Sequence, residues 1–171
     1  MSSKLATDTG TIPKSCPSRV SWEDLGERVR FVIRKLFGRE FLVKEDVLAA
    51  FSGAASGQSP KFIAELLTNT VRKTFRPTNI VLVAKGDEVG ERVLLAFRGG
   101  TRPVTLRQSP LQARIPFEDM LVALPLGKGE ETEYLILLGE LPRGSAYGFL
   151  EMGILRSLLA QAKLFYENAC L

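Results

Sequence analysis

Met120-Leu-Val-Ala-Leu-Pro-Leu126 and Glu133-Tyr-Leu-Ile-Leu-Leu-Gly139, joined through Gly127-Lys-Gly-Glu-Glu131, form the stretch that decides the fold. Both flanking segments are nearly continuous runs of Leu, Val and Ile, and a glycine-bearing turn separates them, so they predict a β-hairpin. Strands that are apolar on both sides are typical of central strands whose two faces are both covered. The sequence therefore predicts a buried hairpin at the centre of a sheet.

Further strands are expected upstream of this hairpin. Ile80–Ala84 and Arg92–Phe97 flank the polar segment Lys85–Glu91 and predict a second hairpin. Val104–Arg107 is a short candidate strand, and residues 108–116, with prolines at both ends of the segment, predict a loop. The sheet is thus expected within residues 80–139.

Helices are expected on both sides of the sheet in the sequence. Residues 21–37 carry apolar side chains at spacings of three and four after the candidate cap Ser21, and Gly38 is a suitable stop. A short helix is expected over Glu45–Phe51, followed by a small-residue loop over residues 52–57. Ser59-Pro60 then predicts the start of a helix that continues to about residue 75. A closing helix is expected over Phe149–Ala169.

The first and last of these helices carry heptad-like apolar stripes. One stripe can cover the sheet while another meets a second helix, in the same chain or in a partner chain. We expect a homodimer through these terminal helices, and the alternative is that both stripes are buried within one domain. The stripe residues are Trp22, Leu25, Val29, Val32 and Leu36 in the first helix, and Leu155, Leu158, Ala162 and Phe165 in the last.

The overall composition fits one globular domain. The chain has 171 residues, of which 45% are apolar and 25% charged. Residues 1–19, rich in Ser, Thr, Pro and Lys, predict a flexible lead-in before a single domain over residues 20–171. No apolar run approaches the roughly 20 residues of a membrane span, and no leader is visible, so we expect a cytoplasmic protein without a membrane segment. The net charge of +4 is too mild to indicate a nucleic-acid partner.

The residue types argue against catalysis. The chain has no histidine, which removes the commonest general base and a common metal ligand. Cys16 and Cys170 cannot by themselves form a zinc site, and Gly127-Lys-Gly129 lacks the spacing of a phosphate-binding loop. The carboxylates of Glu130 and Glu131 lie near a turn and are interpreted as solvated charge. We therefore expect no enzymatic activity, no catalytic residue and no metal site.

Several motifs, taken together in their order along the chain, resemble a GAF domain of the kind found in bacterial sensor kinases and serine phosphatases. The downstream motifs are Leu124-Pro-Leu-Gly127, the strand that ends at Gly139, Tyr147-Gly-Phe-Leu-Glu151, Leu155-Arg-Ser-Leu-Leu-Ala-Gln-Ala162 and Glu167-Asn168. The upstream motifs are Phe37-Gly-Arg-Glu-Phe41, Val47-Leu-Ala-Ala-Phe-Ser52 and Arg76-Pro-Thr78. The resemblance covers roughly residues 37–168.

The resemblance implies an α+β fold with a central antiparallel sheet of five to six strands, N- and C-terminal helices packed on one face and a ligand pocket on the other. The first helices would occupy residues 21–75, the sheet residues 80–139 and the closing helix residues 149–169. The implied function is that of a non-catalytic sensory or regulatory domain in a bacterial signal-transduction protein. Such a domain passes signals through dimeric flanking helices to an output domain of the same parent protein. The alternative is a ligand-free dimerisation scaffold whose pocket is filled by its own side chains.

Five arginines and no acidic residue lie between Arg92 and Phe117. Guanidinium groups bind phosphate or carboxylate through paired donors. Because the resemblance places loops of this region beside the pocket, Arg98, Arg102 and Arg114 are candidate ligand-binding residues for a cyclic nucleotide or another small anion. The alternative is a solvated loop. Haem and bilin are not expected, because histidine is absent and both cysteines lie far from the pocket region.

Overall fold

The computed structural model describes residues 40–171. The helix expected over residues 21–37, with Trp22, Leu25, Val29, Val32 and Leu36, lies outside the described residues, as does the boundary expected between residues 19 and 20. The described part belongs to one compact unit, Arg39–Leu171.

The central hairpin is confirmed. Strands β1 (Ile80–Ala84), β2 (Val104–Thr105), β3 (Val122–Leu126) and β4 (Tyr134–Leu138) form one sheet in the order β1-β4-β3-β2, with antiparallel neighbours throughout. β3 and β4 occupy its centre, with Leu124 opposite Ile136. All five residues of β3 and four of the five in β4 are buried. Both faces of the hairpin are therefore covered.

Each central strand contributes to two separate cores, because successive side chains of a strand point to opposite faces. Leu124, Leu126 and Ile136 pack into one apolar cluster, and Ala123, Leu135 and Leu137 pack into the other. The hairpin thus fixes the elements on both sides of the sheet.

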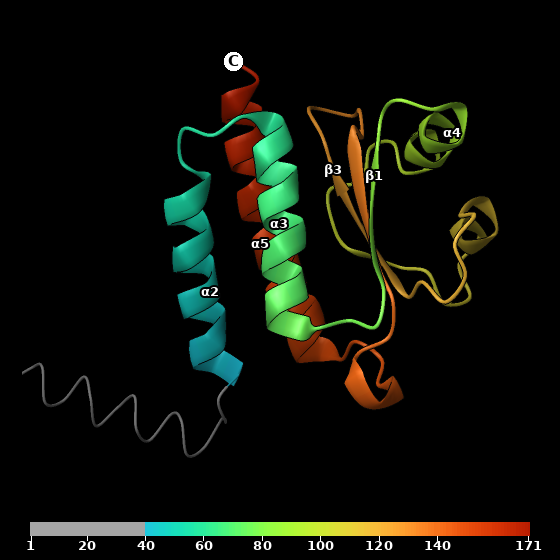
Figure 1. Cartoon of the computed structure of the whole chain (residues 1–171), viewed down its shortest axis with the longest axis horizontal. Coiled ribbons are helices and arrows are strands. Elements are labelled where there is room, and N and C mark those ends of the chain that lie inside the picture. The colour runs from blue at the N-terminus through green and yellow to red at the C-terminus, as the bar shows by residue number, and fades with distance from the viewer. Residues whose placement is uncertain (1–39) are drawn as a thin grey trace, which may run out of the picture. The chain divides into compact units, whose positions relative to one another are not determined.

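Three helices lie on one side of the sheet (Figure 1): α2 (Glu40–Ala55), α3 (Pro60–Phe75) and α5 (Phe149–Ala169). α3 and α5 pack directly against the sheet, and α2 packs on their outer side. The core between these helices and the sheet includes Ile63, Leu67 and Leu158, none of which is exposed. The expected mixed α+β class and the bounds of the closing helix are confirmed.

Local signals explain the start and end of α3. The Ser59 hydroxyl accepts a hydrogen bond from the Phe62 N–H at 3.3 Å, and Pro60 occupies the first turn, where its missing N–H costs nothing. Arg76 adopts the left-handed conformation that commonly terminates a helix, and Pro77 follows it. The predicted start and end of this helix are confirmed.

The hairpin expected over residues 80–97 is wrong, because residues 88–96 form helix α4 (Glu88–Ala96). The Asp87 carboxylate caps this helix by accepting the Gly90 N–H, and acidic side chains in the first turn favour the positive end of the helix dipole. Gly90 is required there, since a Cβ would lie 2.9 Å from the Ala84 carbonyl oxygen. The described residues therefore form a sheet of four strands, and the strand expected over 92–97 is not part of it.

Three smaller boundaries also differ from expectation. α2 continues to Ala55, so residues 52–55 are helical rather than loop. β2 ends at Thr105 rather than at Arg107. The segment expected as loop contains a short 3-10 helix, η1 (Pro110–Arg114), and a second one, η2 (Pro142–Gly144), precedes α5. No described helix combines the length and the apolar character needed to cross a bilayer.

The second face of the sheet is covered by α4 and η1. Val93, Leu94 and Phe97, spaced as on one face of a helix, pack with Leu106, Ile115 and Met120 against Ala123, Leu135 and Leu137 of the hairpin. These apolar side chains fill the space between α4, η1 and the sheet, so a pocket on this side of the sheet can lie only at the edge of this core.

We expect Leu158→Ala to lower the free energy of unfolding by about 2 to 5 kcal/mol, since it removes a fully buried side chain from the core between α5 and the sheet. Leu164→Ala makes the same chemical change in the same helix, at a side chain that is 58% exposed, and should change stability by no more than about 0.5 kcal/mol. Urea denaturation of the two variants provides the measurement. Equal losses would contradict the assignment of the buried face of α5.

Candidate functional site

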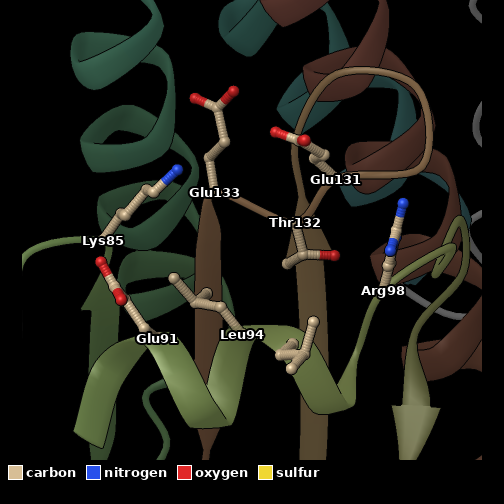
Figure 2. Close-up of a pocket in the computed structure, with 8 residues that line it drawn as sticks. Lys85, Glu91, Leu94, Arg98, Glu131, Thr132 and Glu133 are labelled. Carbon is tan, nitrogen blue, oxygen red and sulfur yellow. The ribbon is translucent and has the colours of Figure 1, made fainter. Parts of the chain in front are cut away.

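A pocket of about 300 Å³ opens between α4 and the segment that leads into β4 (Figure 2). This volume is at the lower end of the roughly 300 to 1,000 Å³ of small-molecule sites. The pocket is lined by Lys85, Glu91, Leu94, Leu95, Arg98, Glu131, Thr132 and Glu133.

Three parts of the chain bring these side chains together. Lys85 follows β1, four residues come from α4 and its C-terminal end, and Glu131 to Glu133 precede β4. Two hydrogen bonds of 2.8 Å join the last two parts: Thr132 Oγ1 donates to the Phe97 carbonyl, and the Gly99 N–H donates to the Glu130 carbonyl. These bonds fix the spacing of the pocket walls at the Arg98 end.

The turn between β3 and β4 depends on a glycine. A Cβ at Gly127 would overlap the Glu131 carbonyl oxygen, because the turn folds back closely over this residue. The Glu133 N–H then donates to the Leu126 carbonyl at 3.0 Å and restores the pairing of the two strands. Glu131, Thr132 and Glu133 are thereby presented as one wall of the pocket.

The pocket contains charges of both signs. Lys85 and Arg98 are basic, and Glu91, Glu131 and Glu133 are acidic. In Figure 2, Lys85 and Glu91 lie at one end and Arg98 at the other, with the Glu131–Glu133 segment between them. Within the described part of the chain the one ion pair joins Arg92 to Glu88, so none of the five pocket charges pairs with another. Apart from the hydrogen bond that Glu133 accepts from Tyr166, these charged groups can therefore contact a ligand.

Leucine side chains form the apolar part of the pocket. Leu94 is only 4% exposed and belongs to the core beneath α4, whereas Leu95 is 67% exposed at the rim. An apolar portion of a bound molecule can therefore contact the α4 side of the pocket.

One pocket residue also contacts the opposite helical layer. The Glu133 carboxylate accepts a hydrogen bond from the Tyr166 hydroxyl of α5, and Tyr166 has no exposed surface. Burial and this hydrogen bond raise the pKa of Tyr166 above its usual value. The Tyr166 ring also packs edge-on against Tyr134, with ring centroids 6.1 Å apart.

The same turn contacts the end of α5 a second time. Lys128 Nζ donates to the Cys170 carbonyl at 3.3 Å, a favourable position for a cation because the C-terminal end of a helix is negative. The segment between β3 and β4 therefore contacts both the pocket and the last turns of α5.

Of the three arginines predicted to bind a ligand, the structure brings only Arg98 to this pocket. Arg102, in the loop before β2, and Arg114, at the end of η1, are exposed and do not line it. Sequence reasoning missed Lys85 and Glu91 because the segment between them was expected to be a hairpin turn. Sequence reasoning also missed Glu131, because its carboxylate near a turn was interpreted as a solvent-exposed charge without a role in binding. The Asp87 cap followed by acidic residues was the signal that could have identified α4.

The C-terminal stripe residues are used inside the described unit. Leu155, Leu158 and Ala162 have no exposed surface, and they cannot contact a second chain without opening the core. Phe165 packs edge-on against Phe51 of α2, with ring centroids 6.4 Å apart. For these residues the structure agrees with the alternative in which the stripe is buried within one domain.

A second hollow of about 340 Å³ lies between the α2–α3 loop and the end of α5. Its lining residues carry no charge: Ser56, Gly57, Gln58, Phe165, Asn168 and Ala169. Among the described residues no group of three or more cysteines and carboxylates is arranged to hold a metal ion. Because the second hollow has no charged lining residue, the mixed-charge pocket beside α4 is the stronger candidate site for a polar ligand.

Comparison with models of known protein families gives no match for this chain, and comparison with curated proteins gives none either. The function must therefore be argued from the site.

We expect Tyr166→Phe to lower the free energy of unfolding at neutral pH by about 1.5 to 3 kcal/mol, the usual value of a hydrogen bond to a charged group. The raised pKa of Tyr166 means that the folded chain keeps the phenolic proton at pH values where the unfolded chain releases it. Stability due to this group is therefore complete below its unfolded pKa of 10.0 and falls as the pH rises further. The difference between the two proteins should shrink above that pH.

Urea unfolding measured from about pH 8 to about pH 11 tests this pH dependence. Tyr147→Phe is a comparison variant: burial raises the pKa of Tyr147 from 10.0 to about 12, so its difference from wild type should also shrink above that pH, but from a smaller value because its hydroxyl donates to the neutral Gly139 carbonyl rather than to Glu133. A difference between wild type and Tyr166→Phe that stays constant up to pH 11 would contradict the burial of a protonated Tyr166.

Proposed function

We propose that this unit is a non-catalytic regulatory domain that binds a small molecule in the pocket beside α4 and transmits its occupancy to α5. One observation carries this proposal: Glu133 lines the pocket and also accepts the hydroxyl proton of Tyr166, a buried residue of α5. A ligand that contacts the Glu133 carboxylate therefore changes the only side-chain partner described for that hydroxyl.

The energy available for this transmission follows from the burial of Tyr166. A buried hydroxyl left without a partner costs about 1 to 3 kcal/mol. Coupling between two sites typically has the same size, about 1 to 3 kcal/mol. A ligand that strengthens or weakens the Glu133–Tyr166 bond would therefore shift the stability of the last turns of α5 by a useful amount.

The composition of the site supports a binding role rather than catalysis. The chain has no histidine, and the pocket contains no cysteine or serine. Its one hydroxyl group, on Thr132, donates to the Phe97 carbonyl and holds the pocket wall. The pocket residues therefore offer charges and apolar contacts but no activated nucleophile.

The resemblance to GAF domains agrees with this role. We ascribe the four-stranded sheet to a GAF-like platform in which α4 replaces the strand expected over residues 92–97. On this proposal the domain belongs to a bacterial, cytoplasmic signal-transduction protein and reports to an output domain of the same parent protein. Because Leu155, Leu158 and Ala162 are buried within one unit, a homodimer through α5 would use the opposite side of that helix, where Leu164 is 58% exposed. α5 is then the element that carries the signal.

A second candidate function is a ligand-free dimerisation scaffold. One observation favours it: on the face of the sheet where the resemblance implies a ligand pocket, Phe97, Leu106, Ile115 and Met120 fill the space against the sheet. In a scaffold the Glu133–Tyr166 bond would serve only to fix α5. The two candidates differ in whether a small molecule binds at the rim.

We expect Glu133→Ala to increase amide hydrogen exchange in the last two turns of α5 by about 10-fold, equivalent to about 1.4 kcal/mol, because the Tyr166 hydroxyl loses its partner. Glu131→Ala is the matched control, since it removes a carboxylate from the same pocket that has no hydrogen bond to α5. Mass-spectrometric exchange of the intact chain measures both variants. Equal protection of α5 in Glu133→Ala and Glu131→Ala would refute the transmission route.

A further inference from the structure

We infer that the pocket beside α4 binds a zwitterion, a small molecule that carries one ammonium and one carboxylate group on a short apolar chain. This inference rests on the proposed function and names the class of ligand for the same site. It replaces the small anion expected from the arginine-rich segment.

The charges around the pocket disfavour ligands of a single sign. A simple anion would gain contacts with Lys85 and Arg98 but would face the carboxylates of Glu91, Glu131 and Glu133. A simple cation would face Lys85 and Arg98. Two like charges about 4 Å apart repel by about 4 kcal/mol at an effective dielectric constant of 20. A molecule with both charges can satisfy groups of both signs.

The arrangement of the charges gives the ligand a direction. Figure 2 shows Arg98 at one end of the pocket and Glu91 at the other, with Glu133 on the facing wall. The planar guanidinium of Arg98 can bind a carboxylate through two parallel N–H donors. An ammonium group at the other end would lie near Glu91 and Glu133, two carboxylates that outnumber the one basic side chain there, Lys85.

The leucines of α4 suit the middle of such a molecule. Leu94 lies between Glu91 and Arg98 along the helix, and the neighbouring Leu95 leaves 67% of its surface exposed. A short methylene chain laid across these side chains would cover part of that apolar surface. The volume of about 300 Å³ limits the ligand to a small molecule.

The ammonium end explains how occupancy reaches α5. An ammonium beside Glu133 adds a charged donor to a carboxylate that already accepts the Tyr166 hydroxyl. Glu133 then has two donors, and its position relative to Tyr166 depends on whether the ligand is bound. A ligand held at Arg98 alone would not reach this link.

Three probes with the same five-carbon skeleton separate the charge requirements: 5-aminopentanoate, pentanoate and pentylammonium. Each is titrated into the isotopically labelled full chain while the backbone amide signals are followed by NMR. We expect 5-aminopentanoate to shift the amides of Glu91, Arg98 and Glu133 in a saturable manner, with a dissociation constant at least about 5-fold below those of the other two probes.

Matched variants locate the two ends of the ligand. Arg98→Gln and Glu91→Gln should each weaken 5-aminopentanoate at least about 5-fold. Arg102→Gln removes another exposed arginine, one that does not line the pocket, and it should leave the dissociation constant unchanged. Equal effects of Arg98→Gln and Arg102→Gln would show nonspecific attraction and overturn the inference.

The other outcomes are also decisive. Tighter binding of pentanoate or pentylammonium, or no saturable shift with any probe, overturns the zwitterion. If pentanoate binds best and Glu133→Ala still loosens α5, the proposed function stands and only the ligand class fails. If 5-aminopentanoate binds best but Glu133→Ala leaves α5 unchanged, the ligand class stands and the transmission route fails.

Discussion

The packing of the β3–β4 hairpin against two layers at once is the constraint on which the rest of the structure depends. Side chains alternate across each strand, so Leu124 and Ile136 hold the α3–α5 layer while Ala123 and Leu135 hold α4. Helices on opposite faces are therefore positioned by the same ten strand residues. The turn between β3 and β4 is therefore held in a fixed position relative to both the α3–α5 layer and α4.

The mixed-charge pocket lies where this apolar packing ends. The two strands of the hairpin are buried along their length. Polar side chains occur at the turn, where Glu131, Thr132 and Glu133 precede β4. Thr132 reaches toward α4 through the Phe97 carbonyl, and Glu133 reaches α5 through the Tyr166 hydroxyl. Two adjacent residues thus bond to opposite layers, and the turn is a polar connection between the pocket and α5.

The parts of the fold that could be predicted are those with strong local signals. The buried hairpin follows from two apolar runs around a glycine turn, and α3 from Ser59-Pro60 and its apolar spacing. α4 was missed because the five apolar residues Val93–Phe97 fit either a strand or a helix, and the choice was made by the Asp87 cap and the close approach at Gly90. The pocket depends on α4, so Arg98 was predicted from its charge and from the family resemblance rather than from the geometry of this pocket. The bond from Glu133 to Tyr166 spans 33 residues, and no local pattern encodes it.

If the unit transmits ligand binding as proposed, the closed core on the α4 side determines how the signal can travel. Protein interiors are packed as densely as organic crystals, so a small ligand at the rim cannot displace Phe97 or Leu106 without a large penalty. A hydrogen bond can change partner at far lower cost, and the Glu133–Tyr166 bond is the point where the pocket meets a buried polar group of α5. On the proposed function, the response of α5 would be limited to the value of that bond, about 1 to 3 kcal/mol. This corresponds to roughly a 5-fold to 150-fold shift in an equilibrium, which is the range of an allosteric regulator rather than of a folding switch.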